Sequence, residues 1–181
     1  MTNNEGIDTT VIASKQVLAD SLYPTPDSSF ISNLPEPDSL GPSSTIDTRN
    51  VSREKLVQFA ESLLGIPYVY ASSDPKVGFD CSGFITYVFN NFNIKVPRSS
   101  VDFTNEGREI RASEARRGDI ILFTGTNPLE RIVGHMGIIV SNTDTLKFIH
   151  STSGRAMGVT VSPLSPGYQK RFMKTIRVFK D

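Results

Sequence analysis

The last third of the chain constrains the fold most strongly, because it consists of short, β-branched apolar runs separated by turn residues. These runs are residues 120–123, 132–140, 146–150, 159–161 and 172–179. Runs of this length and composition predict β-strands. The part before them has helical periodicity instead, over residues 52–64 and from 81 to about 91. Helices followed by strands predict an α+β fold, in which the helices pack on one side of an antiparallel sheet.

A change in composition near residue 50 divides the chain in two. Residues 1–50 contain five prolines, eight serines and six threonines, and seven acidic against two basic residues give them a net charge of −5. Such a segment buries little apolar surface, so we expect an extended acidic tail with at most a short helix over residues 14–22. Residues 51–181 can form one core and carry a net charge of +5. We therefore expect a tail over 1–50, either lying on the domain or covering its active cleft, and one domain over 51–181.

Charge, hydropathy and cysteine content exclude several classes of protein. No stretch approaches the roughly 18 consecutive apolar residues that a membrane helix needs, so no integral membrane segment is expected. The net charge is zero, which gives no reason to expect a nucleic-acid partner. A single cysteine excludes an internal disulfide and a zinc site built on several thiolates. Met1 is followed by polar residues rather than a basic start and an apolar core, so no signal peptide is expected.

The single cysteine, Cys81, stands at the predicted start of the second helix, directly after Asp80. A free cysteine on an apolar helix face is usually a small buried hydrophobe. At a helix start, however, unpaired backbone amides and the helix dipole favour the thiolate and lower the thiol pKa. The position therefore makes Cys81 a candidate nucleophile.

The chain has two histidines, each at one end of a predicted strand. His135 begins one run and His150 ends the next. If these strands are antiparallel neighbours, both imidazoles can lie near one end of the sheet. A lone histidine on a strand is usually structural, but a thiol, a base and a group that orients the base are the three parts of a cysteine-dependent nucleophilic site.

Six motifs run in order through the second part of the chain: Pro67-Tyr68-Val69-Tyr70, Phe79-Asp80-Cys81-Ser82-Gly83-Phe84, Val96-Pro97-Arg98-Ser99-Ser100, Arg117-Gly118-Asp119-Ile120-Ile121-Leu122-Phe123, Gly134-His135-Met136-Gly137-Ile138 and Phe148-Ile149-His150-Ser151. On these motifs, the sequence resembles the NlpC-type cysteine peptidases that cut bacterial cell-wall peptides. The resemblance covers residues 52–181. It implies a papain-like fold, with the helix that bears the nucleophile packed on the antiparallel sheet.

The resemblance also implies roles for particular residues. Cys81 would be the nucleophile, His135 the general base and then acid, and His150 the residue that orients His135. Tyr68 would lie beside the nucleophile. Asp80, Ser82 and Ser100 would help bind the amino end of the substrate. The implied reaction is hydrolysis of the bond between γ-D-glutamate and a diamino acid such as meso-diaminopimelate, in peptidoglycan stem peptides or muropeptides. The reaction needs no metal or cofactor. We expect a monomer that acts in the cell envelope, with a cytoplasmic location as the alternative.

Two departures from the family pattern and several alternatives accompany this interpretation. Ala71 and Ser72 stand where the family often has two glycines, and the chain carries no recognisable wall-binding repeat. A thiol amidase or acyltransferase could use the same Cys-His pair. Cys81, His135 and His150 could instead hold a zinc ion, with water in the fourth position. A non-catalytic wall-binding module is the remaining alternative.

Overall fold

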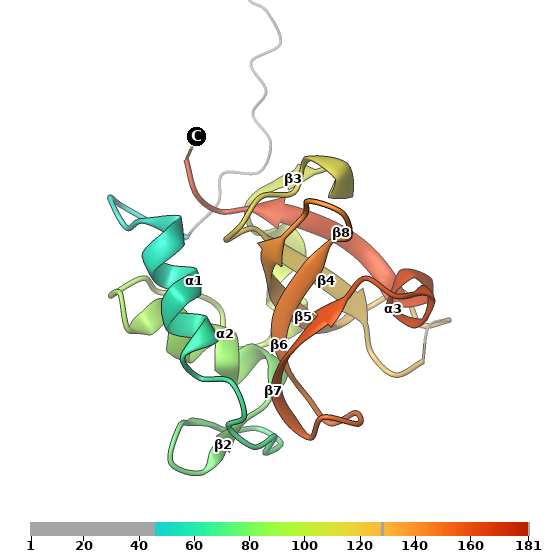
Figure 1. Ribbon diagram of the computed structural model, residues 1–181, viewed down its shortest axis with the longest axis horizontal. Helices are drawn as coiled ribbons and strands as arrows, with labels where there is room; N and C mark the ends of the chain where they lie inside the picture. Colours follow the sequence, from blue (N-terminus) through green and yellow to red (C-terminus); the bar gives the residue numbers. More distant parts are fainter. Residues whose placement is uncertain (1–45, 128, 181) are drawn as a thin grey trace, which may run out of the picture. The chain divides into compact units, whose positions relative to one another are not determined.

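The computed structural model describes residues 46–127 and 129–180 (Figure 1). Helix α1 spans Arg53–Glu61 and follows the predicted apolar periodicity. Ser52 caps it by accepting a hydrogen bond from the backbone N–H of Lys55. The helix ends earlier than predicted, because residues 62–65 form a turn that closes on Gly65 with a φ of +85°.

Helix α2 spans Cys81–Asn90, so the predicted start of the second helix is confirmed. Asp80 caps it by accepting a hydrogen bond from the backbone N–H of Gly83. Four apolar side chains on one face of the helix are completely buried: Phe84, Ile85, Val88 and Phe89. The cap and this face together fix where the helix begins and which way Cys81 points.

Six antiparallel strands form the main sheet, in the order β3-β8-β4-β5-β6-β7. Their bounds are β3 Arg108–Ile110, β4 Ile120–Thr124, β5 Val133–Ser141, β6 Lys147–Thr152, β7 Gly158–Pro163 and β8 Phe172–Arg177. Each of the five predicted runs overlaps one of these strands. β3 was not predicted, because it has three residues of which two are charged.

Shorter elements fill the connections. A two-stranded sheet of β1 (Ser73–Asp74) and β2 (Gly78–Phe79) lies between α1 and α2. The 3₁₀ helix η2 (Ser100–Asn105) follows α2. A second 3₁₀ helix, η3 (Ala112–Glu114), and a short helix, α3 (Pro166–Arg171), were not predicted.

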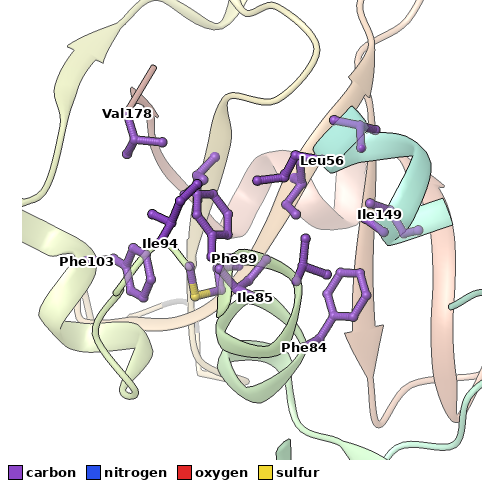
Figure 2. Close-up of a cluster of buried hydrophobic side chains, with 14 of the residues drawn as sticks. Leu56, Phe84, Ile85, Phe89, Ile94, Phe103, Ile149 and Val178 are labelled. Atoms are coloured by element: carbon purple, nitrogen blue, oxygen red, sulfur yellow. The ribbon is translucent and has the colours of Figure 1, made fainter. Parts of the chain in front are cut away.

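The two faces of the sheet carry separate apolar clusters. On one face, α1 and α2 pack against the sheet, and Figure 2 shows Leu56, Phe84 and Ile149 from three elements converging there. On the other face, Phe123 and Phe148 pack with Tyr168 of α3. The two long helices thus cover one face as predicted, and α3 adds a partial cover on the other.

The described part of the chain begins before the predicted domain boundary. Ile46 and Thr48 are buried, and the Thr48 hydroxyl donates a hydrogen bond to the carbonyl of Val178 at 3.4 Å. The helix expected over residues 14–22 lies outside the described residues. Among the helices that the structure does describe, none has the length and apolar character to cross a membrane.

Candidate active site

Cys81 opens into a cleft with a volume of about 520 Å³. Its Sγ lies 3.9 Å from the carbonyl oxygen of Gly134, the residue before His135. The start of α2 and the start of β5 therefore meet at the thiol. The cleft also brings together the other residues that the resemblance singled out, since its lining includes Tyr68, Asp80, Ser82 and Ser100.

Gly83 allows the chain to fold closely around the nucleophile. A Cβ at this position would lie 2.1 Å from the backbone oxygen of Ser72, which is too close for any side chain. That same oxygen accepts a hydrogen bond from the backbone N–H of Asp80 at 2.9 Å. The loop that forms one wall of the cleft is thus joined directly to the start of α2.

The two histidines lie side by side, as the strand pattern predicted. Nε2 of His135 is 2.8 Å from Nδ1 of His150, and both residues are buried. A Cβ on Gly137 would lie 2.7 Å from the ring of Phe148 and 3.2 Å from Cβ of His150, so a glycine is needed there for the rings to pack. Because Nε2 of His135 faces His150, only its Nδ1 is available to the thiol.

The second nitrogen of His150 has partners that the sequence did not reveal. Nε2 lies 2.9 Å from Oγ of Ser162 on β7 and 3.4 Å from the hydroxyl of Tyr168 on α3. The described structure therefore contains a continuous line of polar groups, from His135 through His150 to Ser162. No sequence motif marked Ser162 or Tyr168, because their proximity depends on the β6–β7 register and on a helix that we did not predict.

The protonation equilibria of the thiol and the imidazoles differ from what we expected. Burial, followed by the charge of Asp80, raises the pKa of the Cys81 thiol, although backbone amides at the helix start act in the opposite direction. Burial, followed by His150 and Arg171, holds the pKa of His135 well below 6.5. The expectation of a lowered thiol pKa was wrong, because burial outweighs the effect of the helix start. The free protein therefore favours a neutral thiol and a neutral imidazole.

Asp80 and Ser82 are tied to an arginine whose role we did not predict. Arg98 forms a bidentate ion pair with the Asp80 carboxylate, at 3.1 and 2.8 Å, and its guanidinium also donates to Oγ of Ser82 at 2.9 Å. The Ser82 hydroxyl in turn donates to Asp80 at 3.3 Å. Arg98 belongs to the Val96–Ser100 motif that carries the family resemblance. The sequence therefore marked this arginine, but it did not show that the side chain binds Asp80 and Ser82.

Tyr68 keeps its proton near neutral pH. Burial, followed by the charges of Cys81 and Asp80, raises the pKa of the Tyr68 phenol. A protonated phenol that lines the same cleft as the thiol can donate a hydrogen bond to a bound substrate.

The geometry argues against the alternative in which Cys81 and both histidines hold a metal ion. The two facing imidazole nitrogens are at hydrogen-bond distance, which leaves no space for an ion between them. Within residues 46–127 and 129–180, no group of three or more His, Cys, Asp and Glu side chains is arranged to hold a metal ion.

We expect the stability of the protein to fall in mild acid because of His150. Burial and the charge of Arg171 lower the pKa of His150 to about 4, against 6.5 for an ordinary histidine. Between these values the unfolded chain binds more protons than the folded one, so the free energy of unfolding falls as pH drops from 6.5 to 4, by about 3 kcal/mol for this group. Urea unfolding at several pH values measures the slope. A His150→Asn variant with the wild-type slope would contradict the assignment.

Ala71 departs from the family pattern at a backbone position that favours glycine. Its φ is +59°, in the left-handed region. Ala71→Gly is therefore expected to raise the free energy of unfolding by about 1 kcal/mol, as measured by urea unfolding. The matched control is Ala115→Gly, at a buried position with a φ of −61°, which should destabilise the protein.

Comparison with known proteins assigns the chain to a family. The NlpC/P60 family model matches residues 65–178, which is more than half of the chain. A probable endopeptidase of Haemophilus influenzae is 37% identical over 118 residues, which are 63% of this chain and 67% of that protein. A gamma-DL-glutamyl hydrolase of Bacillus subtilis is 36% identical over 127 residues, which are 70% of this chain but only 29% of that protein.

Solved structures agree with this assignment. An NlpC/P60 family protein from Bacillus cereus superposes with a TM-score of 0.63 at 27% identity, covering 73% of this chain and 42% of that one. The predicted α+β, papain-like fold class is thereby confirmed, with the helix that bears Cys81 packed on the antiparallel sheet. The chain belongs to the NlpC/P60 family.

Proposed function

We propose that this protein is a cysteine endopeptidase that hydrolyses the bond between γ-D-glutamate and a diamino acid in peptidoglycan stem peptides. One observation carries the proposal: a single thiol opens into a cleft where α2 meets β5, and His135 at that end of β5 is linked to His150. The relatives named gamma-DL-glutamyl hydrolase and peptidoglycan endopeptidase support the substrate class. The chain spans 29% of the gamma-DL-glutamyl hydrolase, 52% of the peptidoglycan endopeptidase and 67% of the probable endopeptidase, so their additional segments have no counterpart in this match.

In the proposed acylation step, Nδ1 of His135 accepts the thiol proton as Sγ of Cys81 attacks the γ-carbonyl carbon of D-glutamate. The bond from carbon to sulfur forms and the carbonyl oxygen becomes an oxyanion, which the backbone N–H groups at the start of α2 and the Tyr68 hydroxyl stabilise. Protonated His135 then gives its proton to the departing amine of the diamino acid, and the amide bond breaks. The product is a thioester on Cys81.

Deacylation completes the cycle. His135 removes a proton from a water molecule, which attacks the thioester carbonyl, and the sulfur leaves and regains its proton from His135. His150 orients the ring of His135 through the contact between their nitrogens. The resemblance to the family implied that Asp80, Ser82 and Ser100 help bind the amino end of the substrate. We keep this as a proposal in which Arg98 holds the first two in place.

The protonation equilibria predict how the rate of Cys81 alkylation depends on pH. Because the pKa of the thiol is raised and that of His135 is lowered, proton transfer accompanies attack rather than preceding it. We expect the rate of Cys81 modification by iodoacetamide to rise continuously from pH 6 to 9. The matched reference is the denatured chain, which has the same single cysteine. A plateau between pH 5 and 8 in the folded protein would instead show a preformed thiolate and overturn this prediction.

The test of the proposed function is product analysis by mass spectrometry on a defined panel of muropeptides, with and without a free amino-terminal L-alanine. We expect free diamino acid peptides and fragments ending in D-glutamate. Cleavage between the glycan and L-alanine would instead identify an amidase, and acyl transfer without hydrolysis would identify a transferase. The panel also shows whether intact wall fragments or freed peptides are preferred. We propose that the protein acts as a monomer in the cell envelope, where its proposed peptidoglycan substrate lies.

A further inference from the structure

The line of polar groups behind His135 does not end at His150. His150 is completely buried, and its Nδ1 faces His135 at 2.8 Å. Its Nε2 faces Oγ of Ser162 at 2.9 Å and the Tyr168 hydroxyl at 3.4 Å. Ser162 lies on β7 and Tyr168 on α3, so two elements outside the proposed triad converge on this one nitrogen.

The positions of the protons along this line are coupled. Only one of the two facing imidazole nitrogens can carry a hydrogen. If His135 is to accept the thiol proton on Nδ1, its own hydrogen must be on Nε2 and must be donated to Nδ1 of His150. His150 then carries its hydrogen on Nε2, and that buried N–H needs an acceptor.

When His135 is protonated during the reaction, no other arrangement of the protons is possible, and the Nε2–H of His150 must have an acceptor. A protonated imidazole carries hydrogens on both nitrogens, so His135 can only donate toward His150. The neutral ring of His150 must then donate from Nε2. Ser162 supplies the nearest oxygen, and a hydroxyl accepts a hydrogen bond without adding a charge to the buried site.

Two aromatic contacts hold the ring of His150 in place. The ring of His150 lies against Phe148, with centroids 4.8 Å apart, and against Tyr168, with centroids 5.6 Å apart. The guanidinium carbon of Arg171 lies 5.9 Å from the centroid of the Tyr168 ring, and Arg171 donates to the Thr124 carbonyl at 2.9 Å, which anchors α3 to β4. His150 therefore has little freedom to find another acceptor.

We infer that Ser162, with the Tyr168 hydroxyl as a second acceptor, is a positioning residue that holds His150 in the tautomer protonated on Nε2. This inference rests on the proposed function, because it assigns to Ser162 the task of keeping Nδ1 of His135 open to the thiol. Ser162 does not touch the reacting atoms and acts only through His150.

The tautomers can be read directly, because the chain contains only two histidines. Long-range ¹H–¹⁵N spectra of the ¹⁵N-labelled full chain at pH 7 should show two neutral imidazoles, each protonated on Nε2. In Ser162→Ala, a measurable fraction of His150 should move its proton to Nδ1. A wild-type spectrum with His150 protonated on Nδ1, or an unchanged His150 tautomer in Ser162→Ala, would overturn the inference.

Kinetics give an independent measurement. Ser162→Ala should lower kcat by about tenfold with an unchanged KM, and Ser162→Ala with Tyr168→Phe by about 100-fold, because the buried N–H then has no hydroxyl to accept it. Ser162→Thr, which keeps the hydroxyl, should stay within about threefold of wild type. The matched control is Thr160→Val on the same strand, which should leave kcat unchanged. An equal loss in Ser162→Thr and Ser162→Ala would contradict the positioning role.

The outcome separates this inference from the proposed function. If Ser162→Ala keeps full activity while Cys81→Ala has none, Ser162 is not a positioning residue and the proposed function stands. If Cys81→Ala hydrolyses the substrate normally, the proposed function fails, whatever the tautomer of His150.

Discussion

Replacing Cys81 by alanine is expected to lower kcat for stem-peptide hydrolysis by roughly 10⁴-fold or more, because the acyl-enzyme cannot form without the sulfur. The variant should keep its thermal stability, since Cys81 lies at the partly exposed start of α2 and Asp80, which caps the helix, is unchanged. Turnover measured by chromatography of the released diamino acid peptide, together with a thermal melt, checks both expectations.

Thr86→Ala is the matched control for this experiment. Thr86 lies on the same helix as Cys81, and its hydroxyl donates to the Pro97 carbonyl at 3.4 Å rather than lining the cleft. Its activity should remain within a few-fold of wild type. Hydrolysis by Cys81→Ala at more than about a tenth of the wild-type rate would refute the nucleophile assignment.

The largest effect on stability is expected for Asp119→Ala. Asp119 is completely buried directly before β4, where its two carboxylate oxygens accept hydrogen bonds from Arg177 at 3.0 and 2.9 Å and from the backbone N–H of Arg116 at 2.7 Å. Arg53 approaches it at 3.5 Å. Removing this carboxylate takes away the bidentate contact that it makes with the buried guanidinium of Arg177, which should lower the free energy of unfolding by about 3–5 kcal/mol.

Urea unfolding monitored by circular dichroism measures this loss. The control is Asp144→Ala, an aspartate on the exposed turn between β5 and β6, which should change the free energy of unfolding by less than about 0.5 kcal/mol. A similar small change in Asp119→Ala would mean that the buried ion pair contributes little to the fold.

The sequence predicted the elements that have strong periodicity and missed those that are short or polar. The runs that became β4 and β5 were predicted because their apolar residues are contiguous and β-branched. β3 and α3 were missed, because a charged strand of three residues and a helix of six leave too little periodicity to detect. Both take their structure from tertiary contacts with neighbouring strands and apolar clusters.

The reactive residues of the candidate site could be predicted from the sequence, but the residues that position and bury them could not. Cys81, His135 and His150 stand in motifs, and their residue types limit the possible chemistry. Ser162 could not be predicted, because it reaches His150 through the pairing of β6 with β7. The raised thiol pKa was missed for a related reason: a sequence shows that a cysteine begins a helix, but it does not show how deeply the packed sheet and cleft walls bury the thiol.

Covalent labelling tests the central claim most directly. In L-alanyl-γ-D-glutamyl chloromethyl ketone, a reactive group replaces the diamino acid, so the compound should bind in the cleft and alkylate the nucleophile. We predict one inhibitor per chain, attached to Cys81 in peptide mapping, with activity lost in proportion to labelling and protection by substrate. Complete labelling of Cys81 with undiminished hydrolysis, or inactivation with Cys81 unmodified, would contradict the account.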